Sequence, residues 1–291
     1  MKLLLTGAAG FIGAHCVRYF TDQGLEVVAT DIRAGKGVLP LDVSDSSAVR
    51  SMISEVRPQA ILHMAALASV PECESNPAVC WKTNLQGTVN VAKESGPVGA
   101  RIVFFSSAAV YGLPPVLPTP VSTRLAPINL YGLSKGAGEL AVRGYAADHV
   151  VLRLFNIYGE GCARSYVIPD MVQKLRNAKG DLLLQGTGNE SRDFLYISDL
   201  LRLIEKALSV PAGSVFNAGS GKTITIRDLA LNVARLADRP DQVFRFAGPR
   251  LGDFPINFAD ISPGNVPPGW SPEVPLDEGL RRMIREHDQM G

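Results

Sequence analysis

The sequence lacks any long apolar run. Its opening, MKLLLTGAAG, holds one lysine and a short apolar stretch that Thr6 and Gly7 interrupt, which is too brief for the apolar core of a signal peptide. No other stretch approaches the ~20 apolar residues that a membrane-spanning helix needs. These features predict a soluble protein of the reducing cytoplasm that has no membrane partner.

Cysteine pairs and net charge are also scarce. The four cysteines, at positions 16, 73, 80 and 162, form no C-x-x-C pair and make no ligand-spaced cluster with the four histidines, so we expect no metal site and no disulfide framework. Lysine plus arginine (29) nearly balances aspartate plus glutamate (28), which leaves a net charge of +1. Such a chain has no long-range field to attract nucleic acid, so an anionic ligand must be small and held at a local site.

What the first half of the chain does contain is a regular alternation of apolar and amphipathic segments. Apolar runs of a length typical of buried parallel strands occupy residues 2–6, 26–30, 59–64, 101–107 and 149–155. Polar or amphipathic stretches separate them. This rhythm predicts an α/β fold, a Rossmann-type doubly wound parallel sheet with helices on both faces.

The pattern is less regular after about residue 156. We expect, in order, a helix over 166–178, short strands over 182–185 and 192–196, a helix from Ser198, a strand over 215–219 and a helix that a Thr225–Asp228 capping box opens. The proline-rich segment 113–120 is expected to be an irregular loop, because proline cannot serve a central strand.

These elements predict two domains. An NAD-binding Rossmann domain would cover residues 1–155, with segments near 197–219 returning to its sheet. A smaller, discontinuous α/β substrate-binding domain would comprise residues 156–196 and 220–291. A chain of 291 residues is long enough to bury both cores.

The first predicted strand leads into TGAAGFIG, where Gly7, Gly10 and Gly13 are spaced G-x-x-G-x-x-G. Glycine permits a positive φ and a close backbone approach to a ligand, and the helix that follows offers free N–H groups to a pyrophosphate. Asp31 ends the second strand 18 residues after Gly13, close to the ~20 expected of the acid that accepts ribose hydroxyls. A carboxylate there would repel a 2′-phosphate, so NAD is favoured over NADP, although Arg33 argues in the other direction.

A second glycine segment, GSGKT at 219–223, resembles the end of a Walker A loop. The first glycine of that motif would have to be residue 216, which is Phe216. The helix is also delayed until after Thr225, whereas a phosphate loop runs directly into its helix. We therefore do not expect a P-loop nucleotidase.

The stretch YGLSK places Tyr131 and Lys135 four positions apart in a predicted helix, so the two side chains share one face. Ser107 ends the fourth predicted strand. Because the carboxyl ends of the strands line the ligand crevice in a doubly wound fold, the three residues are expected to converge there.

With these residues in hand, the chain resembles the extended short-chain dehydrogenase/reductase family, and within it the NAD-dependent nucleotide-sugar epimerase/dehydratase group typified by UDP-glucose 4-epimerases. The likeness covers nearly the full length. It rests on matches in a fixed order: TGAAGFIG, Asp31, LDVSD, HMAA, TNLQGTVN, SSAAVYG, YGLSK, LRLFNIYG, RDFLYISD and GWSPEVPLDEGL. The resemblance implies NAD as cofactor, a nucleoside-diphosphate sugar as substrate, and a homodimer formed through helices matching 78–93 and 130–146.

The resemblance also implies catalytic roles. The residue matching Tyr131 removes the proton of a sugar hydroxyl as hydride moves to NAD. Lys135 holds the nicotinamide ribose and lowers the pKa of that tyrosine, which is ~10 in a free side chain. Ser107 hydrogen-bonds to the reacting oxygen, and Ser106 is the nearest alternative for that role.

Binding roles follow from the same resemblance. Asn84 helps to position the catalytic region, and His63, at the end of a buried strand, is expected to be a structural core residue. The implied cofactor contacts are Gly7, Gly10, Phe11, Ile12, Gly13, Asp31, Arg33, Asp42, Val43, Met64, Ala65, Ala66, Asn84, Tyr131, Lys135 and Phe155. The implied substrate contacts are Ser107, Asn156, Arg192 and Arg250. The two guanidiniums suit bidentate contacts with a diphosphate, and their alternative is an ordinary ion pair with the nearby Asp193 or Asp253.

Two alanines narrow the reaction. The 4,6-dehydratases and related decarboxylases carry an acidic residue at positions matching Ala108 or Ala109, because their chemistry needs a further acid or base. The sequence therefore favours an NAD-dependent 4-epimerase with Tyr131 as base. Two alternatives stay open: a reductase of 4-keto-6-deoxy sugar nucleotides that uses NAD(P)H, and a non-catalytic dinucleotide-binding regulator. The nucleotide base and the sugar are open as well.

Overall fold

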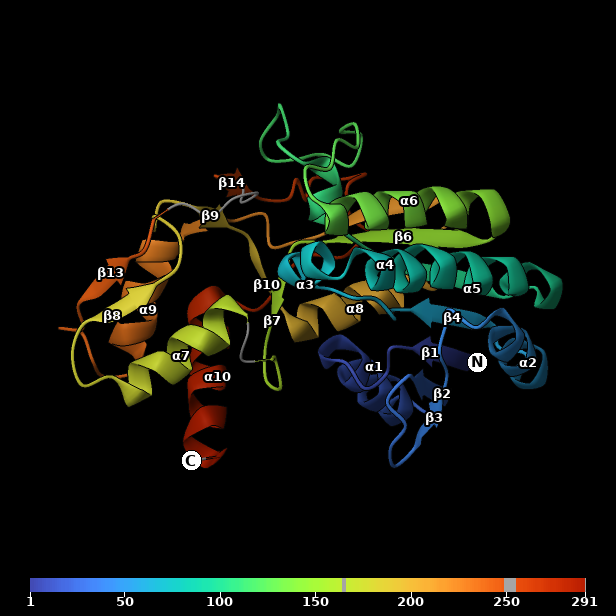
Figure 1. The fold of residues 1–291 in the computed structure, drawn as a ribbon, viewed down its shortest axis with the longest axis horizontal. Coiled ribbons are helices and arrows are strands. Elements are labelled where there is room, and N and C mark those ends of the chain that lie inside the picture. Colours follow the sequence, from blue (N-terminus) through green and yellow to red (C-terminus); the bar gives the residue numbers. More distant parts are fainter. Residues whose placement is uncertain (164–165, 249–254, 291) are drawn as a thin grey trace.

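A seven-stranded parallel sheet forms the centre of the molecule (Figure 1). The structure is a computed structural model that describes residues 1–163, 166–248 and 255–290. The strand order is β11-β6-β5-β4-β1-β2-β3, and every neighbouring pair is parallel. The strands are β1 (Lys2–Thr6), β2 (Glu26–Asp31), β3 (Val38–Pro40), β4 (Ala60–His63), β5 (Arg101–Ser107), β6 (His149–Leu154) and β11 (Ser214–Ala218).

The apolar runs form strands because both faces of this sheet are covered. Side chains alternate between the faces along a strand, so Leu3 and Leu5 enter one buried cluster while Leu4 enters another. Phe104 and Phe105 divide between the two clusters in the same way. A continuous apolar run, rather than an alternating one, is what such a sheet requires.

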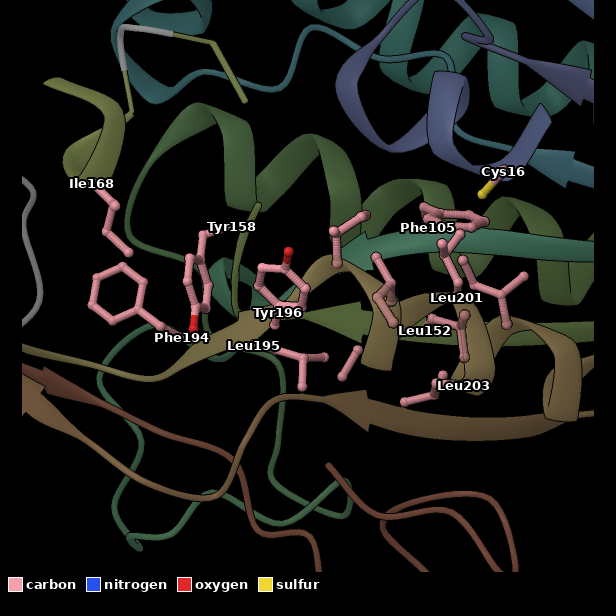
Figure 2. Close-up of a cluster of buried hydrophobic side chains, with 14 of the residues drawn as sticks. Cys16, Phe105, Leu152, Tyr158, Ile168, Phe194, Leu195, Tyr196, Leu201 and Leu203 are labelled. Atoms are coloured by element: carbon pink, nitrogen blue, oxygen red, sulfur yellow. The ribbon is translucent and has the colours of Figure 1, made fainter. Parts of the chain in front are cut away.

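Helices occupy both faces of the sheet (Figure 1). The helices α1 (Phe11–Asp22) and α8 (Ile197–Ala207) contribute to the first cluster. Figure 2 shows this packing, with Cys16 of α1 and Leu201 of α8 on either side of Phe105 and Leu152. The opposite face is covered by α2 (Ser46–Val56), α5 (Gly87–Ser95) and α6 (Leu130–Tyr145).

Short elements connect β4 to α5 and lead into α6. After β4 come α3 (Val70–Ser75), α4 (Pro77–Cys80) and a six-residue π-helix, Trp81–Gln86, which runs directly into α5. Two 3₁₀-helices, Gly96–Val98 and Ala108–Tyr111, precede and follow β5.

The remaining elements gather beyond one end of the large sheet (Figure 1). They form small sheets in the orders β10-β7, β12-β9-β14 and β13-β8. The strands are β7 (Asn156–Tyr158), β8 (Leu182–Leu184), β9 (Ser191–Arg192), β10 (Phe194–Tyr196), β12 (Ile224–Thr225), β13 (Phe244–Phe246) and β14 (Ile256–Asn257). The helices are α7 (Val167–Asn177), α9 (Ile226–Leu236) and α10 (Leu276–Met290).

Most of the expected elements are present. The five strands of the first half lie within one residue of their predicted ends, and the segment 113–120 contains no helix or strand. The capping box is formed, since Thr225 Oγ1 accepts a hydrogen bond from the Asp228 N–H at 3.0 Å. The helix α8 and strand β11, both from the segment predicted to return, join the large sheet. No helix within the described ranges is long and apolar enough to cross a membrane.

The single strand expected over 192–196 is wrong. It is divided into β9 and β10, with Asp193 between them. The Asp193 carboxylate is fully buried and accepts hydrogen bonds from the backbone N–H groups of Ser220, Gly221 and Ala259. A buried carboxylate needs such partners, and turning inward to reach them takes this residue out of the strand.

Candidate active site

The turn between β1 and α1 is shaped by missing side chains. Gly7 has a φ of +75°, and a Cβ there would lie 2.7 Å from the Ala65 nitrogen. A Cβ on Gly13 would lie 2.2 Å from the Gly7 carbonyl oxygen. In the described part of the chain, no side chain caps α1 at Gly10. The turn is therefore a backbone cradle at a helix N-terminus, the arrangement that binds a pyrophosphate.

Asp31 stands directly over this cradle. Its nearly buried carboxylate accepts hydrogen bonds from the backbone N–H groups of Ala9 at 3.0 Å and Arg33 at 2.9 Å. The exposed Arg33 side chain turns back, with its Nε 3.5 Å from Asp31 Oδ1 and an Nη donating to the Ala9 carbonyl. The arginine thus lies beside the carboxylate that the sequence predicted to accept the ribose hydroxyls.

The end of β4 borders the cradle on the other side. Met64, Ala65 and Ala66 follow this strand and are partly exposed, and the Met64 N–H donates to the Thr6 carbonyl at 3.2 Å. The structure therefore brings this predicted cofactor segment against the glycine turn.

His63, one residue earlier, is a core residue, as expected. Its two ring nitrogens lie 2.8 Å from Thr6 Oγ1 and 3.0 Å from Thr88 Oγ1. Burial lowers its pKa to about 3, because an imidazolium in this apolar setting would lose its hydration. The ring is therefore neutral and structural.

The LDVSD element divides its two predicted cofactor residues between surface and core. The Asp42 carboxylate is partly exposed and accepts from the N–H and hydroxyl groups of Ser44, which lower its pKa. Val43 is buried against α5, where a Cβ on Gly87 would lie 2.6 Å from Val43 Cγ2. The Val43 carbonyl accepts from the Asn90 side chain at 2.9 Å.

Asn84 joins the segment after β4 to α6. It lies buried in the π-helix Trp81–Gln86, an irregularity that is frequent at functional sites. Its Oδ1 accepts from the Leu67 N–H at 2.7 Å, and its Nδ2 donates to the Leu67 carbonyl at 3.1 Å and to Ser134 Oγ at 2.9 Å. Ser134 in turn donates to the Tyr131 carbonyl at 2.8 Å. Asn84 is thus placed to position the start of α6, as the resemblance implied.

Ser107, Tyr131 and Lys135 come together at the carboxyl end of β5. The Lys135 ammonium is buried and donates to the Phe105 carbonyl at 2.7 Å. Burial lowers the pKa of Lys135 to about 8. Burial raises the pKa of the Tyr131 phenol above its ordinary value, and a hydrogen bond between the Ser107 and Tyr131 hydroxyls opposes that rise.

The two candidate serines have different surroundings. Ser106 is buried and donates to Glu139 Oε1 at 2.6 Å. Ser107 is partly exposed, contacts Tyr131 and accepts from the Ala109 N–H at 3.1 Å. Only Ser107 lies beside the tyrosine hydroxyl, which favours it for the catalytic role.

The predicted substrate residues lie around β7 and β9. Asn156 Nδ2 donates to the Asp193 carbonyl at 2.9 Å, and Arg192 donates to the Ser191 carbonyl at 2.9 Å. Both side chains are partly exposed. Arg250 lies outside the described residues. Phe155, predicted at the cofactor, is buried beside Tyr111, with the two ring centroids 6.5 Å apart.

The GSGKT segment binds no phosphate through its backbone in the manner of a P-loop. The N–H groups of Ser220 and Gly221 donate to the buried Asp193 carboxylate. Strand β12 also separates this turn from α9. Both observations agree with the rejection of a phosphate loop.

Comparison with known proteins identifies the family. The model of the NAD dependent epimerase/dehydratase family matches residues 3–219. The chain belongs to this family. It is an enzyme of the extended short-chain dehydrogenase/reductase type, and its cofactor is NAD. The backbone cradle at Gly7 and Gly13, which any Cβ would fill, fits the pyrophosphate of that cofactor.

Relatives of more than one activity resemble this family member over its full length. The UDP-glucose 4-epimerase of Mycolicibacterium smegmatis is 28% identical, with 98% of this chain and 97% of the relative covered. The structure of a UDP-glucose 4-epimerase from Thermotoga maritima with UDP-glucose superposes with a TM-score of 0.90 at 28% identity, covering 100% and 99% of the two chains. A dTDP-glucose 4,6-dehydratase from Streptomyces venezuelae with NAD bound gives 0.89 at 26% identity, covering 99% and 97%. Overall likeness therefore identifies the family without identifying the reaction.

Sequence reasoning missed part of this family member's site. Glu139 stands four residues after Lys135 and lies buried beneath the pair, bonded to Ser106 and Arg153. The spacing Tyr131, Lys135, Glu139 on one helix face was an available signal. Cys73 and Cys80 also lie close to Tyr131 and Lys135, and no spacing rule indicated this. Within the described ranges, no group of three or more His, Cys, Asp or Glu side chains could hold a metal ion.

Proposed function

We propose that this enzyme is a nucleotide-sugar 4-epimerase. The observation that carries the proposal is the group formed by Ser107, Tyr131 and Lys135 at the carboxyl end of β5, where the neighbouring Ala108 and Ala109 offer no acid. Such a group can move a proton on and off a sugar hydroxyl but cannot protonate a leaving group.

Each residue has one role. Bound NAD accepts a hydride from C4 and returns it to the other face of the ring, and its positive nicotinamide favours the phenolate of Tyr131. Tyr131 takes the proton of the C4 hydroxyl and later gives it back. Ser107, whose hydroxyl contacts that of Tyr131, holds the reacting oxygen. Lys135 holds the nicotinamide ribose and places a cationic group at the base of the site.

The pKa of Tyr131 needs the complete site. Burial raises it in the protein alone, and Lys135 directs its ammonium to the Phe105 carbonyl at 2.7 Å. The resemblance gave the lysine the larger part in lowering this pKa. The hydrogen bond with Ser107 supports the phenolate directly, so we assign the lowering jointly to Ser107, Lys135 and the cofactor charge.

The surroundings of Ala108 and Ala109 favour epimerisation over dehydration. Both residues are buried in the 3₁₀-helix that follows β5. A Cβ on Gly132 would lie 2.5 Å from the Ala109 carbonyl oxygen, so α6 packs closely on this helix. Elimination of water from the sugar needs a proton donor at this place, and two methyl groups supply none.

We assign a UDP-sugar as substrate. The similar Thermotoga maritima structure is described with UDP-glucose. Asn156 and Arg192 lie partly exposed beyond the end of the large sheet, and we assign them, with Arg250, to the diphosphate, because guanidiniums suit phosphate oxygens. The cofactor contacts predicted from the sequence, the division into 1–155 and 156–291 with its returning segments, and the cytoplasmic location stay predictions.

One assay tests this proposal against its two rivals. The purified protein is denatured and the supernatant examined for NAD; the native enzyme is then offered UDP-glucose or UDP-galactose without added cofactor. We expect resident NAD and interconversion of the two sugars. Turnover only of a 4-keto sugar with added NAD(P)H would replace the epimerase by the reductase. Reversible dinucleotide binding without any turnover would support the regulator.

We also propose a homodimer formed through α4, α5 and α6. Val79 of α4 and Leu133 and Leu140 of α6 are about half or more exposed, at 51%, 48% and 66%. Contacting helix faces rich in such side chains bury them on association. Light scattering should give twice the mass of the 31.1 kDa chain, and Leu140→Glu should lower it toward one chain. A wild-type monomer at assay concentration would refute the dimer.

A further inference from the structure

Two cysteine sulfurs lie unusually close together near the proposed active site. Cys73 Sγ in α3 and Cys80 Sγ in α4 are 2.7 Å apart. Non-bonded carbon atoms prefer ~3.5–4.0 Å, and a disulfide bond measures ~2.05 Å. Both side chains are fully buried and both are free thiols. Their separation lies between a contact and a bond.

The pair is connected to the residues that position the site. Cys73 donates to the Leu67 carbonyl at 3.5 Å, and Asn84 Nδ2 donates to Cys80 Sγ at 3.6 Å. Asn84 also holds Leu67 and Ser134, as described above. Both thiols interact electrostatically with Tyr131 and Lys135. A change at the sulfurs is therefore one residue away from the start of α6 and from the segment after β4.

We propose that Cys73 and Cys80 form a reversible disulfide by exchange with a small-molecule disulfide of the glutathione type, and that this bond lowers turnover. The thiolate of one cysteine attacks the external disulfide and releases one small thiol. The second cysteine then displaces the other small thiol and closes the Cys73–Cys80 bond. Two cysteine thiols are oxidised, one external disulfide is reduced, and the two protons leave on the two released thiols.

The bond would act through Asn84 and Leu67. Closing it removes the S–H group that donates to the Leu67 carbonyl and draws α3 toward α4, from 2.7 Å between sulfurs to ~2.05 Å. Asn84 contacts Cys80, Leu67 and Ser134 at once, so it cannot keep all three contacts unchanged. The reduced pair is therefore the active form, because misplacement of a catalytic group by less than 1 Å is costly.

The burial of the pair sets the rate of this exchange. Burial and the neighbouring Cys80 raise the pKa of the Cys73 thiol to about 12, so thiolate is scarce at neutral pH and exchange should accelerate as pH rises. The sulfurs become accessible only when the six-residue α3 opens. Exchange should therefore be slower than at a thiol exposed in an unfolded chain.

The experiment compares the purified full-length protein after incubation with oxidised glutathione or with dithiothreitol. Peptide mapping under non-reducing conditions should give a peptide in which Cys73 and Cys80 are linked, two hydrogens lighter than the reduced form. Turnover should fall by ~10-fold or more and recover on reduction. Cys73→Ser and Cys80→Ser should each lose this response to oxidation, while Cys162→Ser, a thiol elsewhere in the chain, should keep it. Fluorescence of Trp81, the residue after Cys80, should change with oxidation in the wild type.

Each alternative result is informative. Absence of the linked peptide at equilibrium, while unfolded protein forms it, would refute the disulfide. A linked peptide with unchanged turnover would refute the coupling to the site. A loss of turnover that persists in Cys73→Ser and Cys80→Ser would place the sensitive thiol elsewhere. The effect on turnover rests on the proposed function; if the reduced protein has no turnover, that function fails, while the peptide and the Trp81 signal still decide whether the bond forms and is felt.

Discussion

Glu139 of α6 and Arg153 of β6 form a fully buried, bidentate ion pair directly behind the proposed catalytic residues. Arg153 Nε lies 2.9 Å from Glu139 Oε1, and Arg153 Nη2 lies 2.8 Å from Oε2. Ser106 adds a third hydrogen bond to Glu139 at 2.6 Å. The pair joins the helix that carries Tyr131 and Lys135 to the sheet, and bidentate geometry fixes the distance and angle between them.

Removal of one charge from this pair should be strongly destabilising. Glu139→Gln leaves the Arg153 guanidinium buried without a counterion, which costs ~3–5 kcal/mol. Urea unfolding measures this loss. Asp170→Asn is the matched control, because Asp170 pairs with Lys174 at 2.8 Å on the partly exposed surface of α7 and such pairs contribute ~1 kcal/mol or less. Equal, small losses in the two variants would contradict the structural role of the buried pair.

Replacement of the proposed base should separate catalysis from folding. Tyr131→Phe keeps the ring but removes the hydroxyl that contacts Ser107, so activity should fall by ~10² or more, the scale of general acid–base catalysis. Resident NAD and the urea midpoint should change little. Tyr145→Phe, at the exposed end of the same helix, should behave as the wild type. Full activity in Tyr131→Phe would remove this tyrosine from the mechanism.

The two neighbouring serines should give opposite results. Ser107→Ala removes the hydroxyl beside Tyr131 and should lower kcat with little change in unfolding free energy. Ser106→Ala leaves Glu139 one hydrogen bond short in the core and should lower the unfolding free energy by ~1–3 kcal/mol, with a smaller effect on kcat. Steady-state kinetics and urea unfolding of both variants check this, and a reversed pattern would make Ser106 the catalytic serine.

The glycine cradle should reject even one methyl group. In Gly13→Ala the new Cβ would lie 2.2 Å from the Gly7 carbonyl oxygen, so the backbone must move. We expect a loss of ~1–3 kcal/mol and less NAD in the supernatant after denaturation. Gly144→Ala is the matched control in α6, where a Cβ meets nothing within 4 Å, and it should leave stability unchanged or raise it by up to ~1 kcal/mol. Normal NAD content in Gly13→Ala would contradict the proposed cradle.

Buried His63 should make the fold sensitive to acid. Its pKa falls from 6.5 to about 3 on folding, so between these values the unfolded chain binds the additional proton. Stability is therefore unaffected by His63 above pH 6.5 and declines as pH falls below it, by up to ~1.4 kcal/mol per pH unit. Urea unfolding between pH 7 and pH 4.5, roughly the upper part of this window, should give a steeper decline for the wild type than for His63→Asn. His149→Asn controls for the loss of an imidazole, and identical slopes for wild type and His63→Asn would show that His63 is not buried in its neutral form.

The sequence by itself determined the large sheet, the glycine turn and the Tyr131–Lys135 pair. Each depends on residues close together in the chain: runs of apolar residues that must be buried on two faces, glycines at a strand-to-helix turn, and an (i, i+4) spacing on a helix. Local periodicity therefore predicts them. The short strands of the second half, two or three residues long, contain too few residues to establish a period, and Asp193 interrupted the one strand expected there.

Only the tertiary structure decided which serine faces Tyr131, where Glu139 finds its counterion, and that Cys73 and Cys80 approach one another. Ser106 and Glu139 are 33 residues apart in the chain, and Tyr111 bonds to Asn217 across 106. Such contacts exist because the parallel strands bring distant segments to one edge of the sheet and bury their polar groups, which must then find partners in space. No local pattern encodes that choice of partner.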